Sequence, residues 1–146
     1  MKQIVAFILF CVVSTMVHAW GENCRLYHVH IKNTGTSDCV LKKHYTLYGK
    51  VSSHTKIPDV IFRDRESQFE MNAADGAAAS LLSYECGDDK RITFFTTTST
   101  DTPIIGHYND TRSAIIESKH IEASFESTRC SNFNSTANEI TWTLTP

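Results

Sequence analysis

Residues 80–98 read SLLSYECGDDKRITFFTTT, and this stretch decides the fold class. Apolar side chains recur at every second position on both sides of a central Gly-Asp-Asp-Lys sequence, which is typical of two strands joined by a tight turn. The residues of this period are Leu82, Tyr84, Cys86, Ile92 and Phe94, with Thr96 in the same series. The pattern predicts an antiparallel hairpin with one face buried.

The same two-residue period recurs outward from this hairpin along most of the chain. It is found in the segments 25–32, 40–51, 57–62, 68–71, 121–126 and 140–145. Seven or eight short strands at this spacing predict an all-β fold, an antiparallel β-sandwich. The longest expected loop is 99–111.

Three local features refine this prediction. The turn residues 33–38 are suited to joining 25–33 and 39–49 as a second hairpin. The apolar residues of the second segment, which share one parity and should face the same way, are Leu41, Tyr45, Leu47 and Val51. Residues 73–82 hold helix-forming Ala and Leu, but Gly76 interrupts them and they lead directly into a strand.

Composition excludes several function classes. The chain has 146 residues, 14 Lys+Arg against 16 Asp+Glu, and 41% apolar residues. This length and apolar content fit one compact domain and exclude a disordered charged tail. The nearly balanced charge removes the electrostatic basis for binding nucleic acid.

Residues 1–19, MKQIVAFILFCVVSTMVHA, have the form of a secretory signal peptide. Lys2 precedes a short apolar run, and Val17 and Ala19 occupy the −3 and −1 positions of a cleavage site before Trp20. The run is shorter than the roughly 20 residues that span a bilayer. We therefore predict a secreted domain, residues 20–146, with no integral membrane segment after processing.

Four cysteines remain after processing: Cys24, Cys39, Cys86 and Cys130. An even number in an oxidising compartment predicts two disulfides. The wide spacing lacks the close pairs of a zinc site, so no metal is expected. If 25–33 and 39–49 form a hairpin, Cys24 and Cys39 lie too far apart to bond. Cys24 should then pair with Cys86 or Cys130, and Cys39 with the other.

Two N-x-[ST] sequons occur, at Asn109 and Asn134. In a eukaryotic secreted protein they would be glycosylated, which would place both in exposed loops.

The histidines offer the sharpest candidate for chemistry. His28 and His30 lie two residues apart, so both rings emerge from one face of a strand. No third metal ligand is near in sequence, and no nucleophile motif such as G-x-S-x-G occurs. We interpret the pair as polar residues on a solvated face, and we predict no catalytic residue and no cofactor.

Several short segments between residues 27 and 110 occur in an order that suggests a relationship. They are Val29-His30-Ile31-Lys32-Asn33-Thr34, Tyr48-Gly49-Lys50-Val51, Ile57-Pro58-Asp59-Val60-Ile61, Asp75-Gly76-Ala77, Leu81-Leu82-Ser83-Tyr84, Arg91-Ile92-Thr93-Phe94-Phe95, Pro103 and His107-Tyr108-Asn109. In this order they resemble the secreted β-sandwich cytolysins, the aegerolysins and actinoporins. The resemblance implies recognition of a lipid head group by Phe95, His107 and Tyr108.

One departure limits that resemblance. Actinoporins open pores with an amphipathic N-terminal helix, whereas only residues 20–24 precede the first strand here. The expected function is therefore non-enzymatic binding of a membrane lipid or glycan surface, as a toxin component, lectin-like module or effector. The alternatives are a secreted protein-binding or inhibitory domain and, third, a small secreted hydrolase or nuclease that uses His28 and His30.

Overall fold

The hairpin predicted from residues 80–98 is present. The computed structural model describes residues 25–73, 77–101, 108–110, 113–128, 130 and 138–146. In it, β6 (Ala77–Cys86) pairs antiparallel with β7 (Arg91–Asp101), and Leu82 lies opposite Phe94. Both side chains are fully buried, so the two-residue period correctly predicted the inward face.

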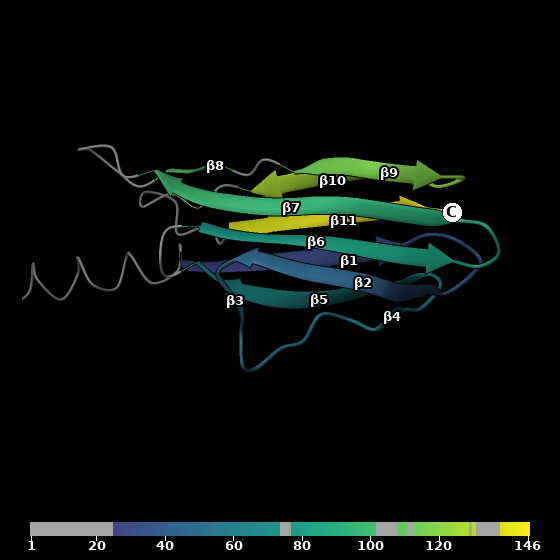
Figure 1. The fold of residues 1–146 in the computed structure, drawn as a ribbon, viewed down its shortest axis with the longest axis horizontal. Helices are drawn as coiled ribbons and strands as arrows, with labels where there is room; N and C mark the ends of the chain where they lie inside the picture. The colour runs from purple at the N-terminus through teal and green to yellow at the C-terminus, as the bar shows by residue number, and fades with distance from the viewer. Residues whose placement is uncertain (1–24, 74–76, 102–107, 111–112, 129, 131–137) are drawn as a thin grey trace, which may run out of the picture.

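Two sheets form a sandwich around this hairpin. The six-stranded sheet contains β4 (Val60–Ile61), β2 (Cys39–Tyr48), β6 and β7, followed by β8 (Tyr108–Asp110) and β9 (Ala114–Lys119), which both pair with β7. The five-stranded sheet contains, in order, β10 (Glu122–Thr128), β11 (Asn138–Thr145), β1 (Leu26–Asn33), β5 (Arg65–Asn72) and β3 (Lys50–Val51). In Figure 1, β2, β6 and β7 lie in front of β1 and β11.

The predicted β-sandwich is confirmed, but its strand count is not. The described part of the chain holds eleven strands instead of seven or eight. Three of the eleven, β3, β4 and β8, have only two or three residues, which is too short to show a period. The segment 99–111, expected as a loop, contains the end of β7 and all of β8, and the region 73–82 enters β6 as a strand.

The predicted hairpin of 25–33 with 39–49 is wrong, because β1 and β2 belong to different sheets. β1 pairs antiparallel with β5 and parallel with β11. The buried amide of Asn33 explains the crossing, since it donates hydrogen bonds to the carbonyls of Ser37 (2.8 Å) and Ile61 (3.1 Å). These bonds tie the 34–38 turn to β4 on the six-stranded side.

Strand β2 departs from the regular alternation that the sequence suggested. Bulges between Leu41 and Lys43, and between Thr46 and Tyr48, shift its register against β6. Each bulge inserts one extra residue and reverses the facing of the residues after it. Leu41 therefore packs against the core while Tyr45, of the same parity, faces outward. The single face expected for these residues is wrong.

Gly49 separates β2 from β3. Its φ of +71° lies in the left-handed region, and a Cβ there would come within 2.6 Å of the Asn72 carbonyl oxygen. Only glycine fits this close approach without strain. The chain thereby passes from the six-stranded to the five-stranded sheet.

A series of aromatic rings runs from the core between the sheets outward to the exposed Phe125. The ring centroids of Tyr84 and Phe94 lie 6.2 Å apart, those of Phe94 and Trp142 4.4 Å, and those of Trp142 and Phe125 4.8 Å. The buried hydroxyl of Tyr84 donates to the Pro58 carbonyl at 2.9 Å. Burial raises the pKa of Tyr84 well above its usual range.

The disulfides agree with one of the two predicted arrangements. Cys39 and Cys86 lie opposite each other on β2 and β6 and are bonded. Cys130 is buried and also disulfide-bonded. Cys24, with the predicted signal peptide 1–19, lies outside the described residues. The hairpin premise used to exclude a Cys24–Cys39 bond was wrong, although Cys39 does bond elsewhere.

Candidate functional site

The outer face of the six-stranded sheet carries a row of apolar side chains across four strands. Tyr45 on β2 lies opposite Leu81 on β6. Leu81 lies opposite Phe95 on β7, and Phe95 lies opposite Ala114 on β9. Neighbouring strands are about 4.8 Å apart, so Tyr45 and Phe95 are separated by about 10 Å across the sheet. Tyr48 faces outward further along β2. We call these five residues the aromatic face.

The two tyrosines stand out from this face. Tyr45 is 55% exposed and Tyr48 is 64% exposed, whereas Leu81 and Phe95 are half-buried. Single exposed apolar residues are ordinary on a protein surface, but a contiguous cross-strand row is not. The arrangement therefore has the form of a contact surface: two protruding rings at one edge of a half-buried apolar floor.

Lysines border the aromatic face on β2. The Lys42 ammonium lies 2.9 Å from a Glu85 carboxylate oxygen, and this hydrogen bond lowers the pKa of Glu85. Lys43 lies opposite Ser83 on the outer side, and its ammonium pairs with no carboxylate among the described residues. One uncompensated positive charge thus lies beside Tyr45.

Of the three residues predicted to bind lipid, Phe95 lies on this face. Tyr108 lies on β8, opposite Asp101 of β7, in a segment whose side chains are not among those described. Six positions along β7 separate Asp101 from Phe95, about 20 Å in an extended strand. His107 lies outside the described residues, so the three-residue site stays a prediction.

Sequence reasoning missed Tyr45 and Tyr48. The parity of the sequence groups Tyr45 with Leu41 on one face, and the bulge at Lys42 reverses that facing. The available signal was the adjacent pair Lys42-Lys43, which interrupts the alternation of the strand. Two successive charged residues do not fit a strand with one buried face.

The outer face of the five-stranded sheet is polar. His28 on β1 lies opposite Glu70 on β5, with 3.7 Å between Nδ1 and a carboxylate oxygen. His30 forms a 2.8 Å hydrogen bond with Glu66. No cluster of three or more His, Cys, Asp or Glu side chains suited to a metal ion occurs among the described residues. Here the histidines take part in cross-strand polar pairs.

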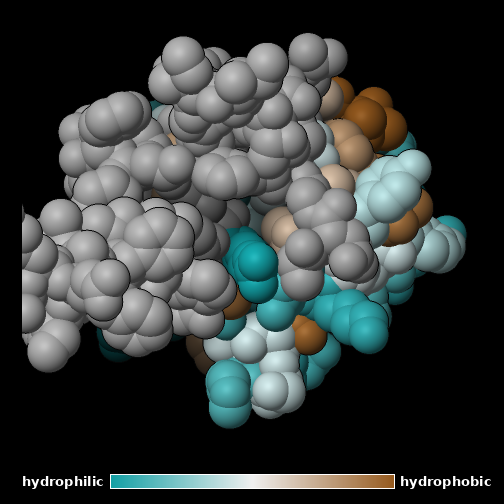
Figure 2. All heavy atoms as spheres, turned by 90° about the vertical axis from the view of Figure 1, so that its left-hand side faces the viewer, coloured by the Kyte–Doolittle hydropathy of each residue, from teal (hydrophilic) through white to brown (hydrophobic). Residues whose placement is uncertain are grey.

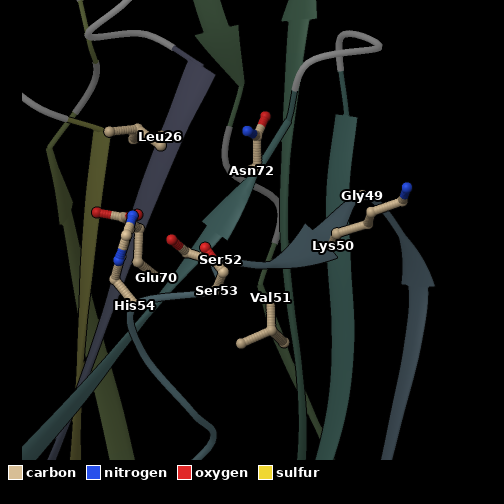
Figure 3. A pocket seen from close by; sticks show the side chains of 9 residues that line it. All are labelled: Leu26, Gly49, Lys50, Val51, Ser52, Ser53, His54, Glu70 and Asn72. Atoms are coloured by element: carbon tan, nitrogen blue, oxygen red, sulfur yellow. The ribbon is translucent and has the colours of Figure 1, made fainter.

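A cleft of about 780 Å³ lies beside β3 and β5 (Figure 3). Leu26 and Val51 give it apolar walls, and Ser53, His54 and Glu70 give it polar ones. Figure 3 shows His54 and Glu70 on the same side of the cleft. No hydrogen bond joins Ser53 to His54 within the described chain, so no Ser–His pair of the nucleophilic kind is assembled.

A second apolar area lies along the edge formed by β9 and β10. Ile115, Ile116 and Phe125 are its exposed large side chains. Figure 2, which views the left end of Figure 1, shows hydrophobic surface at its upper right, on the side of β7 and β9. Phe125 also packs on the buried Trp142, so part of this area continues the core.

Comparisons with known proteins find a solved structure with a similar fold but no matching family. No protein family matches the chain, and no curated protein matches it. Among solved structures, it is similar to the lipid binding protein Nakanori, with a TM-score of 0.56 and 10% sequence identity. The match covers 91% of this chain and 78% of Nakanori. At this identity the likeness shows a shared fold alone, and the aegerolysin and actinoporin resemblance is not confirmed as membership. Among the described residues, no helix is long and apolar enough to cross a membrane.

Proposed function

We propose that this protein is a secreted, non-enzymatic lipid-binding protein that contacts a membrane surface through its aromatic face. The observation that carries the proposal is the outward row of Tyr45, Leu81 and Phe95, with Tyr48 beside it. Tyrosine has an apolar ring and a polar hydroxyl, which suits the boundary between lipid tails and water. Lys43 adds attraction for anionic lipid.

Two further observations support the proposal. Nakanori, which shares the fold, is a lipid binding protein. The Cys39–Cys86 disulfide is consistent with an extracellular protein, as is the signal peptide predicted for residues 1–19. Within this proposal His107 and Tyr108 also contact the lipid, and Asn109 and Asn134 are glycosylation sites.

Vesicle sedimentation tests the aromatic face. We expect Tyr45→Ala/Tyr48→Ala to weaken retention on phosphatidylcholine–sphingomyelin vesicles by about tenfold or more, because two exposed rings lose their contact with lipid. The matched control is Thr141→Ala/Thr143→Ala, on the outer face of the five-stranded sheet. Vesicles with added glycolipid separate recognition of sugar from recognition of the phospholipid head group. Absence of retention on all vesicles, or equal loss in both variants, would refute the proposal.

One observation favours a second candidate, a protein-binding domain. β4 pairs with β2 only at Cys39 and Val40, so in the described part of the chain the rest of that β2 edge has no neighbouring strand. An open edge can accept an extended segment of a partner protein. If that is the function, deletion of Lys42, which removes the bulge from this edge, abolishes binding of the partner protein. Vesicles then retain neither the native protein nor the deletion variant.

A further inference from the structure

A second cleft lies at the end of the sandwich opposite the start of β1. It has a volume of about 600 Å³ and is lined by Thr36, Ser37, Asp38, Phe62, Arg63 and Arg65. The β1–β2 connection forms one wall and the β4–β5 turn forms the other, at the right-hand end of Figure 1. It is distinct from the aromatic face.

Three hydrogen bonds hold the two walls together. The Asn33 amide, which is fully buried, donates to Ser37 on one wall and to Ile61 at the base of the other. The backbone N–H of Arg63 donates to Asp38 Oδ1 at 2.8 Å, which joins the walls directly. The cleft is therefore built from fixed elements.

The β4–β5 turn that carries the arginines is also fixed. The N–H of Arg65 donates to the Phe62 carbonyl at 3.1 Å. Asp64 between them has a φ of +55°, the left-handed conformation that a tight turn requires. This turn places the side chains of Arg63 and Arg65 in one cleft.

The two guanidinium groups are unpaired, as the Lys43 ammonium is, in contrast to three lysines of the described surface. Lys42, Lys56 and Lys119 each form an ion pair with a neighbouring carboxylate. The guanidinium groups of Arg63 and Arg65 form no hydrogen bond or ion pair with any other described residue. Among the described residues that line the cleft, Asp38 is the one with a carboxylate, and its Oδ1 accepts the Arg63 backbone N–H. Two positive charges thus face one negative charge.

Phe62 gives the cleft an apolar rim. Its ring is 59% exposed although it lines the same cleft as the two arginines. An exposed aromatic ring beside cations matches a ligand that presents an anionic group next to apolar material. The hydroxyls of Thr36 and Ser37 supply neutral hydrogen-bond donors on the opposite wall.

We propose that this cleft binds a phosphate monoester group. The Arg63 and Arg65 guanidiniums donate to its oxygens, since the planar fork of arginine matches a phosphate in bidentate geometry. Thr36 and Ser37 donate to the remaining oxygens. Phe62 contacts the substituent that carries the phosphate. The proposal does not require that the aromatic face bind lipid.

Two arms separate a lipid phosphate from a free one. The first titrates the oxidised protein with inorganic phosphate and follows the guanidinium NMR signals of Arg63 and Arg65. The second measures retention on phosphatidylcholine vesicles with and without phosphatidic acid, whose head group is a phosphate monoester. The test variant is Arg63→Gln/Arg65→Gln. The control, Arg25→Gln/Lys50→Gln, removes the same charge from exposed sites at the opposite end of the sandwich, where Asn72 lies opposite both Lys50 and Leu26.

We expect a saturable shift of the guanidinium NMR signals with inorganic phosphate, a gain of vesicle retention with phosphatidic acid, or both. Each response should weaken about tenfold or more in the test variant and persist in the control. A response in the first arm alone identifies free phosphate as the source, and one in the second alone identifies lipid. Phe62→Ala should reduce vesicle retention and leave inorganic phosphate binding unchanged. No binding in either arm, or equal loss in both double variants, overturns the proposal.

Discussion

The two outer faces of this sandwich differ, although its two inner faces are alike. The six-stranded sheet presents Tyr45, Tyr48 and the half-buried Phe95 to solvent. The five-stranded sheet presents histidines that pair with glutamates, such as His30 with Glu66. Inward, both sheets place fully buried aromatic and aliphatic side chains against each other.

The contrast shows where the sequence is constrained by folding and where it is not. An inward side chain must fill the space between the sheets, whichever sheet it belongs to. An outward side chain is under no such requirement, so polar pairs are the ordinary solution there. A row of outward aromatic residues is therefore better explained by binding than by stability.

The largest expected effect is on the core that both faces share. Trp142→Ala should lower the free energy of unfolding by about 3–5 kcal/mol, because it leaves a large cavity between the sheets. Urea unfolding measures the change. The adjacent Thr143→Ala, on the outer face, should cost less than about 1 kcal/mol. Equal effects of the two substitutions would contradict the shared core.

The disulfide affects one sheet directly. Cys39→Ala/Cys86→Ala should lower the free energy of unfolding by about 2–4 kcal/mol, since the bond joins residues 47 positions apart and restricts the unfolded chain. Hydrogen exchange should show earlier opening of β2 than of β1. If both strands open together, the bond does not act locally on the six-stranded sheet.

Substitutions on the two outer faces should cost little stability. We expect Tyr45→Ala and His30→Ala each to change the free energy of unfolding by less than about 1 kcal/mol, because both side chains lie outside the core. Under the proposed function, vesicle retention falls for Tyr45→Ala alone. A loss of more than about 2 kcal/mol for Tyr45→Ala would assign that ring a structural role instead.

The smallest effect concerns the surface pair of Asp89 and Lys119. The hydrogen bond from Lys119 lowers the pKa of Asp89. Its stabilisation is therefore present above the usual pKa of an aspartate, about 4, and is lost as the pH falls through the lowered value. Asp89→Asn should lower the melting temperature slightly at neutral pH, and this difference should vanish in acid.

Asparagine tolerates the φ of +59° at this position, so the turn itself should persist. A difference between Asp89→Asn and the native protein that grows on acidification would contradict the assigned sign.

Part of the fold was predictable because its signal is local. The alternation in 80–98 needs only neighbouring residues, and it correctly placed Leu82 and Phe94 inside. Strand β9 (Ala114–Lys119) was missed because Ile115 and Ile116 are adjacent and both exposed, so no inward period exists. The β1–β11 pairing joins residues such as Val29 and Ile140, and no local pattern reports a partner at that distance.

Of the aromatic face, the sequence suggested only Phe95 as a contact residue, and it did so through the family resemblance, not through alternation. Phe95 follows the regular period of β7, and its outward position was consistent with the proposed contact. Tyr45 was not recognised, because a bulge is a departure from alternation that one sequence does not reveal. The Arg63–Arg65 cleft was also missed, since its walls come from two connections that approach only in the folded chain.

The parallel pairing of β1 with β11 has a consequence for biogenesis. In the described part of the chain, the last strand, β11, is an interior strand of its sheet and lies directly beside the first strand, β1. A nascent polypeptide therefore cannot complete this sheet until residues 138–145 have left the ribosome, and contacts so distant in sequence form slowly. Until then β1 has no partner on that side, and the polypeptide can remain extended because closure of the sheet waits for β11.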